Sequence, residues 1–287
     1  MPVWCEIKFA ARGQSIKAGA FKKGSLAEMV HRVQPFPLDR VPILTLAYGQ
    51  RTFHPELRGS KILRSFEQLA DLATEYRGNR EALEALMPAV KTPAEIKAVG
   101  DDRVLSLMTR GVFQAGFSWK VIDNKWPGFE EAFEGFVPVR WKFMSDDDLD
   151  SLVSDKRIVR NGQKILSVRE NAIFVCDLDD EYGSAATCFA DWPQDELTGL
   201  LDMMKKRGSR LGGMTGQYFL RQLGRDSWAL SRDVVAALVR EGVIDKTPTS
   251  KSAMRAVQQA FNEWAAASGR PFAHISRMLA LSVGPAI

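Results

Sequence analysis

The chain has 287 residues, of which 45% are hydrophobic and 26% are charged, as is typical of a folded protein. No apolar run approaches the roughly 18 residues that span a bilayer, which excludes a membrane helix. The N-terminus lacks the apolar core of a signal peptide, so we expect a cytoplasmic protein. A net charge of +4 is compatible with a polyanionic partner but does not establish one.

Cysteine and histidine are sparse. The chain contains three of each, and they are scattered along it: Cys5, Cys176, Cys188, His31, His54 and His274. A structural zinc site needs about four such ligands, and a cubane iron–sulfur cluster needs about four thiolates. We therefore expect no metal and no cofactor.

Residues 1–64 differ in composition from the rest of the chain. They combine short apolar pieces with the breakers Pro35, Pro37 and Gly49, and they show no long helical period. The pattern predicts an irregular extension with a short helix near 25–33. Its basic beginning is compatible with a solvated tail or with an arm that tracks DNA. We expect residues 65–287 to form one helical domain.

Helical signals begin at Ser65, which is expected to cap a helix that runs through Arg77 and ends at Gly78. Thr92-Pro-Ala-Glu95 is a second start signal, with a capping threonine, proline at the first helical position and a glutamate that closes a capping box.

The next segment predicts the longest helix of the chain. Its apolar residues alternate spacings of three and four, which places them on one face. The stripe consists of Leu105, Met108, Val112, Ala115, Trp119, Ile122 and Trp126. Pro127-Gly128 is expected to end this helix.

Seven further helices follow from caps and terminators. Two start at Ser145, with Asp148 closing a capping box, and at Asn161-Gly162. The others are expected over 195–206, 215–223, 231–240, 250–268 and 272–282. No stretch shows sustained strand alternation, so the predicted fold class is all-α.

A glycine-rich hairpin joins two of these helices at residues 205–216. Glycines let a backbone approach a ligand closely, and the free N–H groups that begin the next helix attract phosphate. Basic side chains around the turn would add attraction to a DNA backbone. An ordinary tight turn between helices explains the hairpin segment equally well.

The run Val112-Phe-Gln-Ala-Gly-Phe-Ser-Trp119 resembles the Q-A-G-L-S-W signature of 3-methyladenine DNA glycosylase I. The similarity continues through Phe129–Phe133, Asp148-Leu149 and Ile158–Ile165, and it covers about residues 92–240. Leu211-Gly-Gly-Met-Thr215 is similar to the L-x-G-h-G helix–hairpin–helix of DNA glycosylases.

The resemblance implies a two-lobed helical fold that binds duplex DNA, without a membrane, as a monomer. Such an enzyme flips an alkylated purine out of the duplex, holds the cationic base by stacking, and hydrolyses its glycosidic bond. Trp119 matches the base-stacking tryptophan, although its stripe also suits a core residue. Gln114 would read the base edge or cap buried backbone, and Ser118 lies on the same turns.

DNA contacts are implied for the hairpin. They fall on Arg207, Arg210, Gly212, Gly213, Thr215 and Gly216. Gln217 occupies the position of the superfamily's Schiff-base lysine. Since an amide cannot form an imine, the activity is expected to be monofunctional.

The sequence differs from the family's pattern in three ways that bear on catalysis. Gly111 stands where the family carries a glutamate that bonds the damaged adenine, and Glu67 is a candidate substitute. The zinc ligands of the best-known members are absent. The superfamily's catalytic aspartate falls near Ser231, so Asp233 and Asp226 are the candidate carboxylates, although a helix first turn or an Asx-turn also suits them.

Two other functions therefore stay open. One is a homologue that recognises damaged DNA without cleaving it, which the loss of the glutamate at Gly111 suggests. The other is a helical scaffold with no role in nucleic-acid binding. Salt-independent affinity for DNA would favour the scaffold.

Overall fold

A computed structural model describes residues 6–8, 15–17 and 63–284, and the chain divides into two units, 1–57 and 58–287. In the first unit, β1 (Glu6–Lys8) pairs antiparallel with β2 (Ser15–Lys17), with Ile7 opposite Ile16. Strands of three residues are too short to show the alternation that predicts a strand, and the sequence analysis missed this pairing. The helix expected near 25–33 lies outside the described residues.

The second unit begins with three helices, of which the first and third start at the predicted signals and the second was not predicted. These are α1 (Phe66–Arg77), α2 (Arg80–Glu84) and α3 (Pro93–Lys97). Ser65 and Thr92 each complete a capping box, so that two otherwise unpaired backbone N–H groups are satisfied at each helix start. Gly78 ends α1 as predicted.

The prediction of one long helix through residues 105–126 is wrong. The segment forms α4 (Asp101–Gln114) and α5 (Trp119–Ala132), separated by a turn in which Gly116 has a φ of +80°. This left-handed conformation suits glycine and cannot continue a right-handed helix. Pro127 lies inside α5 instead of ending it. A proline removes only one helical hydrogen bond, and the buried Phe129 beyond it keeps the helix packed.

Helices α6 to α8 complete one end of this unit. They follow a 3₁₀ turn, η2 (Glu134–Phe136), and are α6 (Pro138–Trp141), α7 (Asp146–Ser154) and α8 (Gly162–Tyr182). The predicted capping box of Ser145 and Asp148 is present at the start of α7. The face of α8 that carries Ile165, Val168, Ala172 and Val175 is buried, as its spacing predicted.

The remaining elements are α9 (Ala185–Asp191), η3 (Gln194–Glu196), α10 (Leu197–Arg207), α11 (Met214–Leu223), α12 (Arg232–Arg240), α13 (Lys251–Ser268) and α14 (Phe272–Leu281). Helices α10 and α11 form the predicted helix–hairpin–helix. The all-α class is confirmed for residues 63–284. Within this range, no helix combines the length and apolar character that crossing a bilayer requires.

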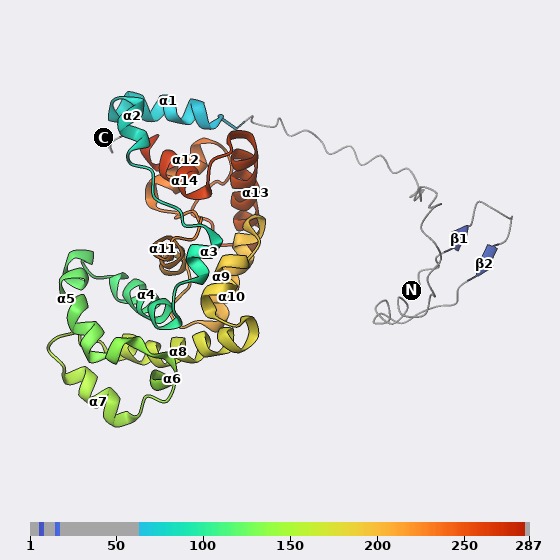
Figure 1. Ribbon diagram of the computed structural model, residues 1–287. Coiled ribbons are helices and arrows are strands. Elements are labelled where there is room, and N and C mark those ends of the chain that lie inside the picture. The colour runs from blue at the N-terminus through green and yellow to red at the C-terminus, as the bar shows by residue number, and fades with distance from the viewer. Residues whose placement is uncertain (1–5, 9–14, 18–62, 285–287) are drawn as a thin grey trace. The chain divides into compact units, whose positions relative to one another are not determined.

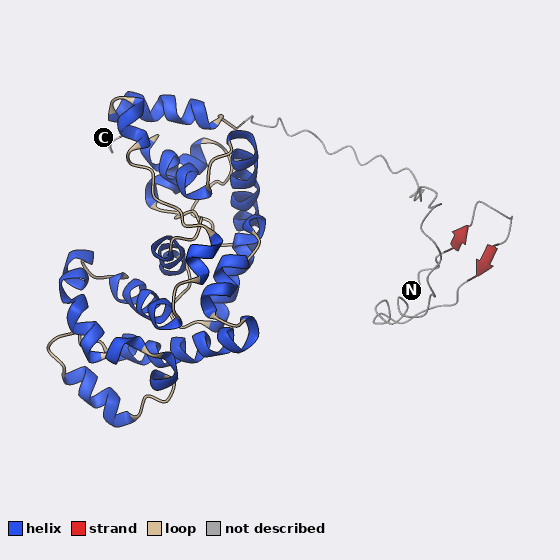
Figure 2. Cartoon of the chain, viewed as in Figure 1, coloured by secondary structure: helices blue, strands red, loops and turns tan. Residues whose placement is uncertain are grey.

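Two groups of helices make up the second unit (Figure 1). One contains α1, α2, α12, α13 and α14, so that the first and last described helices pack together. The other contains α4 to α8, with α4 packed on α8. Helix α11 lies between the groups and packs against α4 (Figure 2).

Candidate functional site

The turn between α4 and α5 exposes a large aromatic side chain. Trp119 is the first residue of α5 and is 44% exposed, because the left-handed Gly116 turns the chain away from the packed face of α4. The indole is therefore not part of the core. Phe117, in the same turn, is also exposed, at 39%.

A pocket of about 170 Å³ lies between this turn and the start of α11. Its lining consists of Gly111, Gln114, Ala115, Gly116, Trp119, Met214, Thr215 and Tyr218. The rings of Trp119 and Tyr218 meet edge to face, with centroids 5.0 Å apart and planes at 87°. The sequence analysis missed Tyr218. Its position three residues after Thr215, on the same helix face, could have indicated it.

Gly111, which the sequence analysis matched to the family's glutamate, lines the pocket. A Cβ atom added there would lie 3.7 Å from Thr215 Cγ2 and from the Thr215 carbonyl oxygen, an ordinary contact distance. Space therefore exists for the first atom of a side chain. No carboxylate from the described residues lines the pocket, so a cationic base would meet aromatic rings and not a negative charge.

Glu67, the candidate substitute for that glutamate, lies elsewhere. It is an exposed residue of the first turn of α1, where it forms an ion pair with Arg80. Helix α1 packs against α14 and α2, while the pocket is built from α4, α5 and α11. The expectation that Glu67 enters the pocket is wrong.

Gln114 is buried and its amide is held by two other side chains. Its Nε2 donates to Asp123 Oδ1 at 3.1 Å, and its Oε1 accepts from Gln222 Nε2 at 2.8 Å. Arg110 also pairs with Asp123, at 2.7 Å. This network fixes the amide of Gln114 beside the pocket without using backbone groups. Ser118 is exposed at the N-cap of α5 and does not line the pocket.

The glycine-rich hairpin at residues 205–216 requires two backbone segments to lie very close together. A Cβ atom on Gly216 would lie 2.3 Å from the Leu211 carbonyl oxygen, so only glycine fits there. Gly213 has a φ of +60° at the start of α11, where no side chain caps the helix. Asn171 of α8 anchors the hairpin, because its amide bonds both the N–H and the carbonyl of Ser209.

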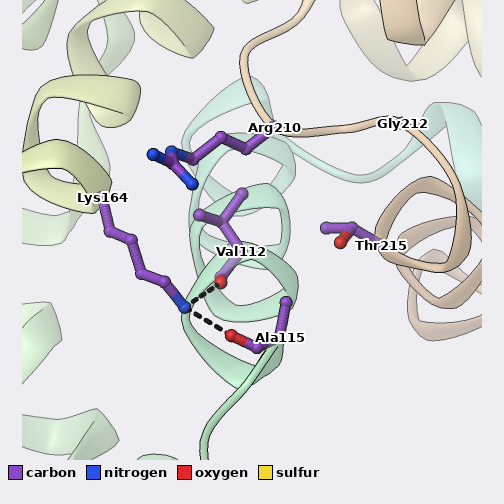
Figure 3. A pocket seen from close by; sticks show the side chains of 6 residues that line it. All are labelled: Val112, Ala115, Lys164, Arg210, Gly212 and Thr215. Atoms are coloured by element: carbon purple, nitrogen blue, oxygen red, sulfur yellow. Dashed lines mark hydrogen bonds between the residues drawn. The ribbon is translucent and has the colours of Figure 1, made fainter.

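A second cavity, of about 350 Å³, lies beside the hairpin (Figure 3). It is lined by Val112, Ala115, Lys164, Arg210, Gly212 and Thr215, among which there is no acidic residue. Lys164 Nζ donates to the carbonyls of Val112 at 2.8 Å and Ala115 at 2.6 Å. Burial lowers the pKa of Lys164, and the positive charge of Arg210 lowers it further. Because two basic side chains and no acidic side chain line it, we call this cavity the cationic cavity.

The two arginines assigned to the hairpin have different surroundings. Arg207 forms a two-bond ion pair with Glu181 of α8, at 2.6 and 2.9 Å, and lies over the ring of Phe174. Among residues 63–284, Arg210 bonds only the neutral Gln163, at 2.7 Å, and it lines the cavity beside the hairpin. The charge of Arg207 is paired within the fold, whereas that of Arg210 has no carboxylate partner among the described residues.

The two candidate aspartates lie outside both pockets. Asp226 accepts from the backbone N–H groups of Phe272 and Ala273 and from Gln194, so it caps α14 from a neighbouring loop. Asp233 is exposed in the first turn of α12. These positions favour the structural interpretations of both carboxylates, the cap and the helix first turn.

Gln217 is buried, and its side-chain oxygen accepts from the Leu230 N–H at 2.7 Å. This residue, which the sequence analysis matched to the superfamily's lysine, holds the loop that follows α11. The zinc of the family's best-known members does not fit the residues that the structure describes: Cys176, Cys188 and His274 lie on three different helices, and no group of three or more potential ligands gathers.

Residues 96–220 match the family model described as methyladenine glycosylase. This match confirms the resemblance predicted from the sequence, and it contains α4, the α4–α5 turn, α5, Lys164 and the hairpin. The matched part of the chain is similar to that family, which supports DNA glycosylase function toward alkylated bases. No curated protein matches the chain.

Solved structures of DNA glycosylases are also similar. The 3-methyladenine DNA glycosylase I of Staphylococcus aureus is 22% identical, with 51% of this chain and 87% of that chain covered and a TM-score of 0.41. The 8-oxoguanine DNA glycosylase of Methanocaldococcus jannaschii is 11% identical over 74% of this chain and 89% of that one, with a TM-score of 0.46. That of Thermotoga maritima is 14% identical over 75% and 93%, with a TM-score of 0.42.

Proposed function

We propose that this protein is a monofunctional DNA glycosylase that flips alkylated purines out of duplex DNA and hydrolyses their glycosidic bonds. The observation that carries the proposal is the half-exposed indole of Trp119, which lines an open pocket together with Tyr218. In the same pocket, Gly111 takes the place of the family's glutamate. Both aromatic rings come from segments inside the family match.

The substrate follows from the character of this pocket. Aromatic faces attract a cationic base, and they do so more strongly where water is excluded. An alkylated purine with a positive charge also leaves its sugar readily, so that acid catalysis is less necessary. The absence of a lining carboxylate among the described residues is compatible with such a substrate, because binding by stacking needs no ion pair.

The cationic cavity supplies a place for the DNA backbone. It shares the lining residues Ala115 and Thr215 with the aromatic pocket, so the two cavities are adjacent. A base in the aromatic pocket would therefore leave a neighbouring phosphate near Arg210 and the start of α11. Arginine and a helix start both favour phosphate.

A second candidate function is recognition of damaged DNA without cleavage. It is favoured by the replacement of the glutamate by Gly111 and by the positions of Asp226 and Asp233 outside the pockets. In this case the pocket would hold a flipped base, and no group would assist its departure.

Release of free base from methylated duplex DNA separates the two functions. The glycosylase is expected to release 3-methyladenine and leave abasic sites without strand breaks, since Gln217 forms no imine. Tight binding to damaged duplex with no released base would establish the second function instead. Equal affinity for damaged and undamaged duplex, with no release, would exclude both.

A further inference from the structure

Three polar side chains form a chain of hydrogen bonds beside the aromatic pocket, which Trp119 and Tyr218 line. Asp123 of α5 accepts from Gln114 Nε2 at 3.1 Å. The oxygen of Gln114, the last residue of α4, accepts from Gln222 Nε2 of α11 at 2.8 Å. Of the three, only Gln114 lines the pocket. The other two therefore act on a bound base only through the amide of Gln114.

Helix geometry places this chain one turn away from the two aromatic rings. Asp123 follows Trp119 by four residues on α5, and Gln222 follows Tyr218 by four residues on α11, so each polar residue shares a helix face with a ring. A step of four residues is about 6 Å along a helix axis. Among the described residues that line the pocket, Gln114 alone carries a side-chain amide. The polar edge of a stacked base therefore meets an amide that is held from both sides.

The carboxylate of Asp123 fixes which atom of the Gln114 amide faces which neighbour. An ionised carboxylate only accepts hydrogen bonds, so the group of Gln114 that meets it must be the NH2 group. The oxygen of Gln114 then faces Gln222, which must donate. Arg110 donates to the same Oδ1 atom of Asp123, at 2.7 and 3.2 Å, and holds the carboxylate in place. All donors of the chain therefore point toward Asp123.

The far end of the chain shows that this direction is imposed. Gln222 Oε1 is buried and has no hydrogen-bond partner among residues 63–284. A buried acceptor without a partner lowers stability. Rotating both amides by 180° would pair this oxygen with the NH2 group of Gln114, but it would also turn the Gln114 oxygen against the carboxylate of Asp123. The unpaired oxygen is therefore a consequence of the orientation that Asp123 requires.

The orientation of an amide decides which purine it pairs with. A 6-aminopurine presents a hydrogen-bond donor at position 6, whereas a 6-oxopurine presents an acceptor there. After its two bonds, Gln114 keeps one lone pair on Oε1 and one N–H on Nε2. A glutamine amide pairs with adenine by accepting from the exocyclic amine. Turned by 180°, the same amide would offer its NH2 group to the oxygen of a 6-oxopurine.

We infer that Asp123 makes the aromatic pocket selective for 6-aminopurines over 6-oxopurines, because it locks the Gln114 amide with its oxygen toward the exocyclic amine of the base. Asp123 is a positioning residue, since it does not line the pocket. The inference rests on the proposed function for its ligand. It gives the pocket a means of recognising an alkylated adenine although Gly111 supplies no carboxylate.

Binding of free bases tests this inference without catalysis. The probes are 3-methyladenine and 3-methylhypoxanthine, in which an oxo group replaces the amine at position 6. In calorimetric titration the unchanged protein should bind 3-methyladenine about tenfold more tightly, since the wrong base leaves buried polar groups unpaired. In Asp123→Asn the side chain donates as well as accepts, so the Gln114 amide is free to turn and the ratio should fall to about twofold. Asp123 is exposed, so this variant should fold normally.

Further variants separate the lock on Gln114 from the loss of an ion pair. Arg110→Met removes the pair but leaves the carboxylate to accept from Gln114, so the ratio of affinities should stay near that of the unchanged protein. Asp155→Asn, which breaks a carboxylate–arginine pair outside both pockets, is the matched control. In a Gln114→Met background, Asp123→Asn should leave the ratio unchanged, since no amide remains to turn.

Three outcomes would overturn the inference. The first is an unchanged protein that does not prefer 3-methyladenine, whether it binds both bases equally or neither. The second is a ratio in Asp123→Asn equal to that of the unchanged protein, including a parallel loss of affinity for both bases. The third is an equal fall of the ratio in Arg110→Met, which would assign the effect to the ion pair. Failure of the proposed function is separate, since it would appear as no release of base from methylated DNA by the unchanged protein.

Discussion

Helix α5 carries two tryptophans with different surroundings, Trp119 at its first position and Trp126 near its middle. Trp126 stacks on Phe129 and Phe136, with ring centroids 5.0 and 5.7 Å away, and its Nε1 donates to Glu130 at 2.9 Å. Trp119 has one edge-to-face contact, with Tyr218, and no hydrogen bond to its Nε1 within the described part of the chain. Trp126 packs within the fold, whereas Trp119 at the start of the helix is left open to the pocket.

The difference teaches that a residue's place in an apolar pattern does not decide its role. Both tryptophans lie on the same stripe in the sequence, and a continuous helix would bury both. The left-handed Gly116 interrupts the stripe between Ala115 and Trp119, so that everything after it is reoriented. Stability and ligand binding should therefore separate between the two rings, and mutations can test this separation.

The largest effect is expected for Trp126, whose half-buried ring packs against the core. Trp126→Ala removes stacking and leaves Glu130 without one of its donors, so the free energy of unfolding should fall by about 3 kcal/mol. Chemical denaturation measures this loss. Base release per folded molecule should stay close to that of the unchanged protein. A selective loss of base release without loss of stability would contradict the structural role assigned to Trp126.

Trp119→Ala should have the opposite profile. Stacking of a base on an aromatic side chain is worth about 1–3 kcal/mol, so base release, or binding of the lesion duplex, should fall about 30-fold. The free energy of unfolding should change little, because the indole is 44% exposed. Trp119→Phe, which keeps an aromatic face, should recover most of the loss. If Trp119→Ala unfolds the protein as readily as Trp126→Ala does, the ring belongs to the core.

A smaller effect should separate the two arginines of the hairpin. Arg210→Met removes a charge that no carboxylate neutralises, so duplex affinity should fall about fivefold and the salt slope by about one. Arg207→Met breaks the pair with Glu181 and should affect stability more than DNA binding. The salt dependence of binding for damaged and undamaged duplexes measures both. Equal losses of affinity in the two variants would mean that the pair with Glu181 opens on DNA.

Local signals predicted most of the helices. Ser65, Thr92, Ser145 and Ser231 all cap helices, because capping depends on side chains within about three residues of each other. The resemblance to the family likewise indicated Trp119 and the hairpin. Prediction from the sequence failed where contacts with distant segments determine the surroundings of a residue.

Three residues illustrate that failure. Glu67 was assigned to the pocket, yet its helix packs at the other end of the unit, against α14. Arg207 was predicted to contact DNA, and no local pattern indicated that Glu181 of α8 would pair with it. Lys164 was not singled out, although its ammonium group bonds the last carbonyls of α4 from a helix some 50 residues away. No pattern within one segment encodes such partners.

Gly111→Glu tests how much of the family's pocket survives. A Cβ atom at this position makes only ordinary contacts with Thr215, so the helix should accept the change. A carboxylate that bonds the exocyclic amine should raise release of 3-methyladenine about threefold, a gain of the size of one net hydrogen bond. Gly111→Gln is the control, because it adds the same bulk without the charge. Equal behaviour of the two variants would show that the pocket does not direct a carboxylate at the base.

The smallest effect concerns acid stability at α7, away from both pockets. Hydrogen bonds from Arg140, followed by those within the capping box at Ser145, hold the pKa of Asp148 well below its usual 3.8. A carboxyl whose pKa is lower in the folded state stabilises the protein above its unfolded value, and this contribution disappears as the pH falls below about 3.8. Asp148→Asn should therefore lower the free energy of unfolding at pH 6 by about 1 kcal/mol, since the pair is partly exposed. The difference from the unchanged protein should shrink when denaturation is repeated near pH 3.

Asp147→Asn, whose carboxylate lies in the same first turn without the capping bonds, should show a smaller dependence on pH. A constant difference between the Asp148 variant and the unchanged protein from pH 6 to pH 3 would mean that the charge of Asp148 contributes nothing and that only its shape fits the cap.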